Sequence, residues 1–220
     1  QELGFKVLFC PTSQVFHFEG MSHGKSISSG IKQYQTVNEN KFRKKWFHLF
    51  KSNGAVDPKN VDFEKDRRTD RRVLFFDYTT PSPNKDAGGY AAVQEMQIFQ
   101  RLGFKVTFVP LNLAHLGAIT QNMQRLGIEV LYAPFYSSVS DTINRRIKEM
   151  DLIYITRFDV AEGIIEQLRK LTTAKIVLNL ADLHFLRHLR SVDDSDESSL
   201  VLIKNLQKRE IEICSKVDAV

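Results

Sequence analysis

Short apolar stretches of strand length alternate with stretches of helical period from Arg72 to the end of the chain. The predicted strands are residues 72–77, 104–109, 129–132, 152–156 and 175–180. The predicted helices are residues 88–102, 116–126, 139–149, 160–171 and 198–215. Strands separated by helices of this length form a parallel sheet that is covered on both faces. The sequence therefore predicts a doubly wound α/β domain over residues 72–220, in which residues 216–220 begin a sixth strand and the domain is truncated at its C-terminus.

The composition excludes several classes of protein. Hydrophobic residues make up 42% of the 220 positions and 16 residues are Phe, so the bulk of the chain is not intrinsically disordered. No apolar run reaches the ~18–20 residues that span a bilayer, and the first residues lack the basic and apolar segments of an export signal. The two cysteines, Cys10 and Cys214, have no metal-type spacing, which suits a reducing compartment. We therefore expect a cytoplasmic protein.

The N-terminal part of the chain has a different organisation. Residues 51–71 show no sustained apolar period and are predicted to be a linker. Residues 1–50 contain two short apolar strands, at 4–9 and 14–18, and a helical stretch at 29–50. Two strands and one helix make a marginal domain by themselves. We interpret this small α+β segment as the tail of an upstream domain, poorly ordered alone or packed on a partner chain.

The positive charge of the chain is local. Residues 41–72 hold eleven Lys or Arg against five Asp or Glu, whereas the whole chain has a formal net charge of +5. The interleaved acids and the lack of a groove-reading motif favour a solvated basic linker, and no nucleic acid is expected. Peripheral contact with an anionic membrane through residues 41–72 is the alternative. The aromatic residues Trp46, Phe47 and Phe50 are interpreted as helix packing rather than as a sugar-stacking platform.

The first loop of the α/β domain carries a candidate phosphate site. Asp86, Gly88 and Gly89 open the helix that follows the first strand. Glycine permits close approach of a ligand to the backbone, and the N–H groups and dipole of a helix N-terminus attract anions. Ligands of open α/β sheets also bind at the carboxyl ends of the strands. The loop matches neither of the glycine-rich nucleotide motifs, so an ordinary turn and helix start is the alternative.

Polar residues follow two later strands at the same predicted edge. Asp182, His184 and Arg187 come after the fifth strand, and Arg157 and Asp159 come after the fourth. An imidazole can act as a general base, a carboxylate can hold a hydroxyl or an imidazole, and a guanidinium can neutralise phosphate. The alternative is structural. In it, Asp182 and Asp159 cap helices and the other side chains lie on a solvated face.

In the N-terminal segment, His17 and Glu19 alternate on one face of a predicted strand, and such a pair can bind a divalent metal. Two ligands do not complete a metal site, so an ordinary polar strand face is the alternative. These residues belong to a longer run that reads His17-Phe-Glu19-Gly20-Met-Ser22-His23-Gly24, followed by Ser29-Gly30-Ile-Lys32-Gln-Tyr34 and by Lys41-Phe42 up to Trp46. The run resembles the C-terminal end of a glycosyltransferase family 2 catalytic domain of GT-A fold.

The resemblance implies a role for His17 in binding the Mg or Mn ion that carries a nucleotide diphosphate. The earlier half of such a domain, with its DxD motif, is absent from this sequence. The metal role therefore belongs to an intact GT-A parent.

Residues 72–220 resemble the N-terminal Rossmann-like domain of a GT-B glycosyltransferase, similar to family 4. The resemblance rests on Val73-Leu-Phe-Phe-Asp77, on Pro81-Ser-Pro83-Asn-Lys-Asp86-Ala-Gly88-Gly89, on Leu102-Gly103-Phe-Lys-Val106, on Leu126-Gly127-Ile-Glu-Val130, on Arg157 and on Ala181-Asp182-Leu-His184-Phe-Leu-Arg187. Such a domain holds the acceptor, and its glycine loop approaches the donor diphosphate. The second domain, which supplies most donor contacts, is missing here, so the isolated chain lacks the full donor site.

Together the two resemblances imply a fragment of a bacterial two-transferase protein of the cell envelope. It would be a hexosyltransferase that moves a sugar from a nucleotide-sugar donor to a cell-surface polysaccharide or a lipid-linked saccharide. Asp182 and His184 would be catalytic, and Asp86, Gly88, Gly89, Arg157 and Arg187 would bind donor phosphate or acceptor. The GT-B part implies no metal cofactor, and the location would be cytoplasmic, at the inner face of the membrane. The alternative is a non-catalytic Rossmann-like module that binds a nucleotide or a partner, with the basic segment as a docking arm.

Overall fold

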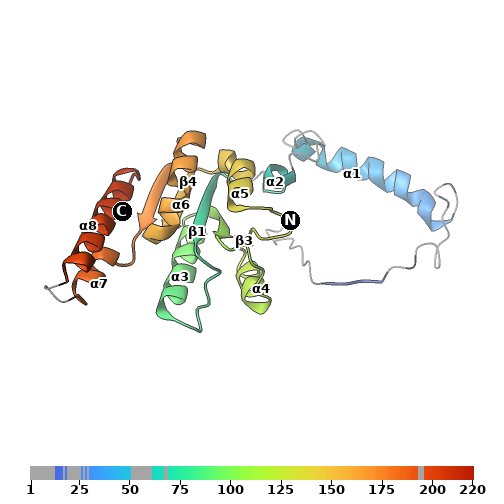
Figure 1. The fold of residues 1–220 in the computed structure, drawn as a ribbon. Helices are drawn as coiled ribbons and strands as arrows, with labels where there is room; N and C mark the ends of the chain where they lie inside the picture. Colours follow the sequence, from blue (N-terminus) through green and yellow to red (C-terminus); the bar gives the residue numbers. More distant parts are fainter. Residues whose placement is uncertain are drawn as a thin grey trace. The chain divides into compact units, whose positions relative to one another are not determined.

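The computed structural model describes residues 13–16, 18, 26, 28, 30–50, 61–66, 69–192 and 196–220 (Figure 1). The chain divides into two compact units, Gln1–Asn60 and Val61–Val220, and each is described by itself. His17, Glu19, His23 and the predicted strand at residues 4–9 lie outside the described residues.

The second unit is built on a parallel sheet. Within the described residues the sheet has five strands in the order β3-β2-β1-β4-β5. The strands are β1 (Arg71–Asp77), β2 (Phe104–Pro110), β3 (Glu129–Val130), β4 (Leu152–Thr156) and β5 (Lys175–Asn179). The central strand β1 pairs with β2 and β4, so that Val73 lies between Val106 and Leu152. The chain therefore winds in one direction from β1 to β3 and in the other from β4 to β5, and the predicted Rossmann-like, doubly wound α/β fold is confirmed.

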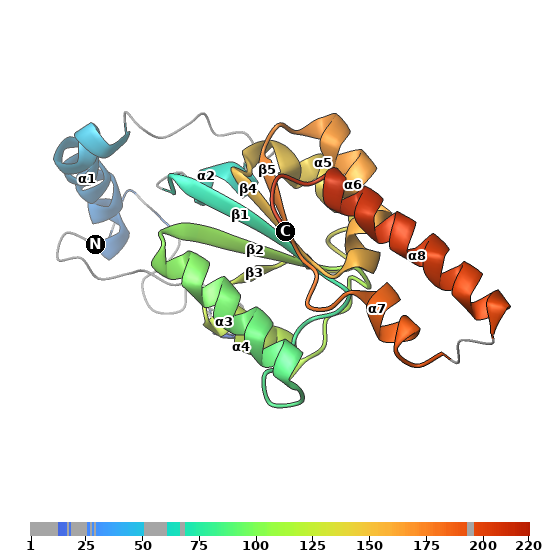
Figure 2. The same cartoon turned by 90° about the vertical axis from the view of Figure 1, so that its left-hand side faces the viewer.

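Helices cover both faces of this sheet. The helices of the second unit are α2 (Val61–Glu64), α3 (Ala87–Arg101), α4 (Ala118–Arg125), α5 (Val139–Arg146) with a 3-10 turn at Ile147–Glu149, α6 (Phe158–Leu171), α7 (His184–Leu189) and α8 (Glu197–Ser215). Figure 2 shows α3 and α4 on one side of the sheet and α5, α6 and α8 on the other. The main elements begin and end within three residues of the predicted bounds, except that α7 was not assigned as an element from the sequence.

Two hydrophobic cores explain the continuous apolar run of β1. Leu74 and Phe76 point into the core beneath α5 and α6, whereas Val73 and Phe75 point into the core beneath α3 and α4. All four side chains are almost completely buried. A strand buried on both faces needs apolar residues at every position, and this is the pattern of parallel sheets.

The end of the chain lies along β5. The backbone N–H of Leu178 donates to the carbonyl of Ala219 at 2.9 Å, and the pair Val177 and Ala219 forms a parallel bridge. The carboxylate of Asp218 accepts a hydrogen bond from the backbone N–H of Ile176 at 2.9 Å. The predicted sixth strand is thus present as a single bridge within residues 216–220.

The end of the predicted linker packs on the second unit. Residues 51–60 lie outside the described residues, but α2 and the two residues after it are tied to the sheet by ion pairs. Lys65 Nζ lies 2.5 Å from Glu129 Oε1, and Lys105 Nζ lies 3.4 Å from Asp66 Oδ1. The interleaved acids and bases that suggested a solvated connector therefore make specific contacts here.

The first unit is described mainly through one helix. A 3-10 turn at Ile31–Gln33 leads into α1 (Tyr34–Phe50), which agrees with the predicted helix at residues 29–50. The described residues 14–16 and 18 are not in a strand, so the prediction of a strand at 14–18 is wrong for these positions. None of the described residues of α1 is buried, so the structure gives no support to the interpretation of its aromatic residues as core packing.

Candidate functional site

The candidate site lies at the carboxyl edge of the sheet, where the strand order reverses between β1 and β4. Ligands of doubly wound sheets bind at this switch point. Asp77 is the last residue of β1 and Arg157 directly follows β4. The Arg157 Nε donates to Asp77 Oδ1 at 3.1 Å, because the two strands are neighbours in the sheet. An ion pair therefore stands at the switch point itself.

The two partners of this ion pair differ in exposure. The Asp77 side chain is 8% exposed, whereas the Arg157 side chain is 50% exposed. Burial raises the pKa of the Asp77 carboxyl above its usual range, although the backbone N–H of Tyr78 and the Arg157 guanidinium partly oppose that rise. In the described part of the chain Arg157 uses only its Nε for this contact, so the Nη groups of the fork are open to a ligand.

Backbone strain gathers at the same edge. Among the described non-glycine residues, positive φ angles occur at Leu113 (47°), Arg157 (79°) and Ala181 (62°). Each of them lies within three residues after the end of β2, β4 or β5. Such conformations cost of order 1–3 kcal/mol and persist mainly where the surrounding structure enforces them. The three strained residues therefore show that the surrounding structure fixes the backbone of the loops at this edge.

Asn179, the last residue of β5, holds two of these strained residues. Its backbone carbonyl accepts from the Arg157 N–H at 2.7 Å, and its Oδ1 accepts from the Ala181 N–H at 3.0 Å. Its Nδ2 donates to Glu95 Oε1 on α3 at 3.0 Å, and Tyr154 Oη donates to Glu95 Oε2 at 3.1 Å. Burial and the Glu95 charge raise the pKa of Tyr154 to about 12, so this phenol keeps its proton and remains a donor.

The role of Glu95, Tyr154 and Asn179 was missed from the sequence. The sequence held one signal that could have pointed to Glu95. This charged residue stands directly beside Met96, which faces the core on α3. The partners of Glu95 lie 59 and 84 residues further along the chain, which no local pattern reveals.

The glycine loop has a structural reason for its sequence. Asp86 Oδ1 accepts from the Gly89 N–H at 2.6 Å and caps α3. A Cβ on Gly89 would lie 2.7 Å from the carbonyl oxygen of Ser82 and 2.9 Å from its nitrogen, so only glycine fits there. A Cβ on Gly88 would meet only Asp86 Oδ1, at 3.4 Å. The Asp86 carboxylate thus already occupies the helix N-terminus, which supports the alternative of an ordinary helix start at these three residues.

One polar atom in this loop has no partner. Thr80 is 3% exposed, and its Oγ1 is buried without a hydrogen bond from any described residue. Thr80 lies three residues after Asp77, and the neighbouring Thr79 accepts from Asn112 Nδ2 in the loop after β2 at 3.1 Å. A buried hydroxyl without a partner in the protein is costly, so Thr80 is a candidate contact for a water molecule or a bound group at this edge.

The predicted residues after β5 are brought together. His184 Nε2 lies 3.5 Å from Asp182 Oδ1, and Arg187 Nη1 lies 3.0 Å from Asp182 Oδ2. Asp182 is 45% exposed, whereas the His184 side chain is only 16% exposed. Asp182 is therefore the more accessible of the two predicted catalytic residues.

The environment of His184 includes two residues from other elements. His184 Nδ1 lies 3.8 Å from Asp159 Oδ1 at the start of α6 and 4.0 Å from Glu210 Oε1 on α8. Glu210 is 1% exposed and accepts from the backbone N–H groups of His184 at 2.8 Å and Phe185 at 3.2 Å. Glu210 therefore accepts the hydrogen bonds of the first two backbone N–H groups of α7. The interpretation of Asp182 as its cap is wrong, since the cap position is Leu183.

The predicted site residues thus fall into three groups. Arg157 pairs with Asp77, the residues after β5 form a second group, and Asp86, Gly88 and Gly89 form a third around the start of α3. His17 lies outside the described residues, and within the described part no group of three or more His, Cys, Asp or Glu side chains is arranged to hold a metal ion.

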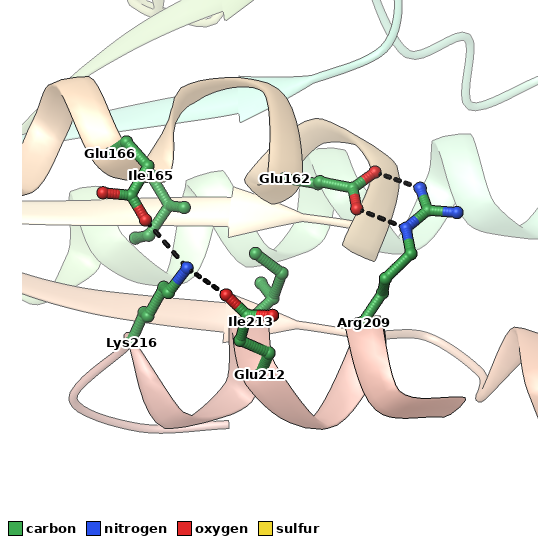
Figure 3. Close-up of a pocket in the computed structure, with 7 residues that line it drawn as sticks. All are labelled: Glu162, Ile165, Glu166, Arg209, Glu212, Ile213 and Lys216. Carbon is green, nitrogen blue, oxygen red and sulfur yellow. Dashed lines mark hydrogen bonds and ion pairs between the residues drawn. The ribbon is translucent and has the colours of Figure 1, made fainter. Parts of the chain in front are cut away.

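A separate groove of about 130 Å³ lies between α6 and α8 (Figure 3). Its lining residues are Glu162, Ile165, Glu166, Arg209, Glu212, Ile213 and Lys216. Arg209 makes a two-pronged pair with Glu162, and Lys216 Nζ lies 2.8 Å from Glu166 and 2.6 Å from Glu212. The charges in this groove bind one another and clamp the two helices together, so the groove is structural.

The helices of the described residues include none that is long and apolar enough to cross a membrane. Comparison of the chain with protein-family models, with curated proteins and with solved structures finds no match.

Proposed function

We propose that this chain is part of a glycosyltransferase that moves a sugar from a nucleotide-sugar donor to a cell-surface polysaccharide or a lipid-linked saccharide in the cytoplasm. The observation that carries the proposal is the Asp77–Arg157 pair at the switch point of a doubly wound sheet. A half-exposed guanidinium held by a buried carboxylate presents its free N–H groups in a fixed direction, which is the geometry for binding phosphate oxygens. The unpartnered Thr80 hydroxyl in the adjacent loop supports a ligand at this edge.

The group after β5 has the chemistry for the acceptor side of the transfer. In this reaction the bond from the anomeric carbon to the donor diphosphate breaks, a bond to the acceptor oxygen forms, and the acceptor proton passes to a base. Asp182 is exposed enough to meet a hydroxyl, and Arg187 and His184 hold its two oxygens. The GT-B resemblance assigns no metal to this step. A Mg or Mn ion would be needed only by the GT-A parent.

A binding experiment tests the donor half of the proposal. We would titrate the full chain with UDP, GDP, UDP-glucose and GDP-mannose and follow backbone amide NMR shifts. Saturable shifts are expected at Asp77 to Thr80 and at Arg157. They should disappear in Arg157→Gln and persist in Arg190→Gln, a control on the exposed arginine that directly follows α7. No saturable shift at these residues with any of the four compounds would overturn the assignment of the Asp77–Arg157 edge as the donor-phosphate site, which is the observation that carries the proposal.

A non-catalytic module that binds a nucleotide or a partner is the second candidate. Two observations favour it, since the Asp86 carboxylate fills the start of α3 and His184 is largely enclosed. The same titration separates the two candidates when released nucleotide is also measured. Release of UDP or GDP that depends on Asp182, with the sugar passing to an added saccharide or to water, supports the transferase. Saturable binding of the nucleotide without that release is the behaviour expected of the module.

A further inference from the structure

The helix α1 presents an aromatic stripe to its surroundings. Phe42, Trp46 and Phe50 are spaced four residues apart and lie on one face of the helix. The ring centroids of Phe42 and Trp46 are 6.3 Å apart, and those of Phe42 and Phe50 are 5.9 Å apart. Phe42 is 56% exposed and Phe50 is 36% exposed. The stripe therefore forms a continuous aromatic surface over the last turns of the helix.

Basic side chains flank the stripe. Lys41, Arg43, Lys44 and Lys45 are all exposed, and Lys45 Nζ lies 4.8 Å from the centre of the Trp46 ring. Glu39 is the one acid of α1, and it pairs with Arg43 at 2.9 Å. A shallow hollow of about 320 Å³ is lined by Glu39, Phe42, Arg43 and Phe50, so the aromatic and charged groups share one surface. This surface combines positive charge with exposed rings.

Two described bases that follow α1 in the basic segment are engaged elsewhere. Lys65 pairs with Glu129, and Arg72 is 6% exposed and donates through Nη2 to the carbonyl of Asp66 at 2.8 Å. Membrane contact was expected for residues 41–72. Within the described part of that region, α1 is the element that carries exposed bases beside exposed aromatic rings.

We infer that α1 binds the surface of an anionic membrane and lies in its plane. Aromatic rings are stable at the boundary between head groups and acyl chains, and lysine and arginine beside them meet the anionic head groups. With 17 residues and four cations the helix lies on a bilayer and does not span it. Binding to a nucleic acid duplex would use the charges but leave the aromatic stripe in water. The inference stands independently of the proposed transferase activity.

Trp46 makes the inference directly testable, because it is the one tryptophan in the sequence. Its fluorescence in the full chain would be followed during titration with vesicles of phosphatidylcholine alone or with 30% phosphatidylglycerol. We expect a blue shift and quenching by brominated acyl chains with the anionic vesicles only. Because each cation contributes roughly 1 kcal/mol of attraction, the triple variant Lys41→Gln/Arg43→Gln/Lys44→Gln should bind about 100-fold more weakly.

The matched control removes three exposed cations from the second unit, in Lys148→Gln/Lys204→Gln/Lys208→Gln. This control should bind the anionic vesicles like the unchanged chain. An absent blue shift, an equal response to neutral vesicles, or an equal loss in the control would overturn the inference. A duplex DNA that binds more tightly than the vesicles at the same salt concentration would also overturn it and assign α1 to nucleic acid.

Discussion

Asp77 is buried at the switch point, and its charge is held there by Arg157. Since burial raises the pKa of Asp77, the folded protein binds this proton more tightly than the unfolded chain does. The stability that the fold gains from binding this proton is complete below the ordinary pKa of 3.8. It is lost as the pH rises through the pKa of Asp77 in the folded protein. Asp77→Asn keeps an acceptor for Arg157 but carries no charge. The free energy of unfolding of this variant, relative to the unchanged chain, should therefore increase from about pH 4 towards pH 7.

Urea unfolding of both proteins across this pH range measures the difference. If the difference in unfolding free energy between Asp77→Asn and the unchanged chain stays constant with pH, Asp77 has the same pKa in the folded protein as in the unfolded chain. In NMR titration, Arg157→Gln should move the pKa of Asp77 further upward, because the guanidinium opposes the rise.

Gly88 and Gly89 are neighbours with different structural roles. Gly89→Ala would place a methyl group 2.7 Å from the Ser82 carbonyl oxygen, so the loop must shift, at a cost of about 1–3 kcal/mol. Gly88→Ala would place a methyl group at 3.4 Å from Asp86 Oδ1 and add a better helix former. Its effect should lie between neutral and about 1 kcal/mol stabilising. Urea unfolding of the matched pair tests this, and equal losses of stability in both variants would contradict it.

Residue types at strand ends could be predicted from the sequence, but their partners could not. Arg157, Asp182 and His184 were selected because they follow buried strands, and the structure places all three at the carboxyl edge. Asp77 was noted only as the end of β1, and Glu210 was not selected at all, because its partner His184 lies 26 residues away in sequence. Contacts between distant segments depend on helix packing, which no local pattern encodes.

At the scale of elements, a buried ionic network fastens β3 to α5. Arg146 is 1% exposed and bonds Glu129 at 3.0 Å, Tyr136 Oη at 3.1 Å and Glu149. Arg146→Met would leave the largely buried Glu149 without its cation and Glu129 with Lys65 alone, at a cost of about 3–5 kcal/mol. The adjacent Arg145 is 46% exposed and its ion pairs are 3.8 Å long, so Arg145→Met should cost under about 1 kcal/mol. Equal destabilisation of the two variants in urea would contradict the assigned role of Arg146.

The same network predicts an acid transition. Burial alone would raise the pKa of Glu129, but the charges of Arg146 and Lys65 outweigh it and lower the pKa to about 2. This pairing stabilises the fold above the ordinary pKa of 4.5, and the stability is lost as the pH falls towards 2. The expected loss is roughly 2–3 kcal/mol. Glu129→Gln should show a flatter dependence of unfolding free energy on pH in this window, and an unchanged slope would contradict the prediction.

Elements differ in how far the sequence predicts them. The strands β1 and β2 have apolar runs that only a doubly covered sheet explains, so both were predicted closely. The short helix α7 was not, because its first N–H groups are satisfied by Glu210 of α8 and not by a local capping residue. The helix α1 was predicted in its bounds, but its aromatic residues suggested a core that the described residues do not form.

At the scale of the whole molecule, the boundary between the two units falls at Asn60 and Val61, inside the predicted linker. The unit from Val61 onward contains both cores and the whole candidate site. A chain that begins at Val61 should therefore unfold in urea in a single transition. Its midpoint should equal that of the second unit in the full chain.

A chain that begins at Thr69 tests the contribution of the segment at residues 61–66. It loses the pairs of Lys65 with Glu129 and of Asp66 with Lys105, and the Arg72 guanidinium loses the Asp66 carbonyl. Each partly exposed ion pair contributes up to about 1 kcal/mol, and a hydrogen bond to a buried cation contributes more. The shorter chain should therefore be about 1–3 kcal/mol less stable than the chain from Val61, with β1 intact in both. Equal stability of the two would mean that the segment is a connector that touches the domain without stabilising it.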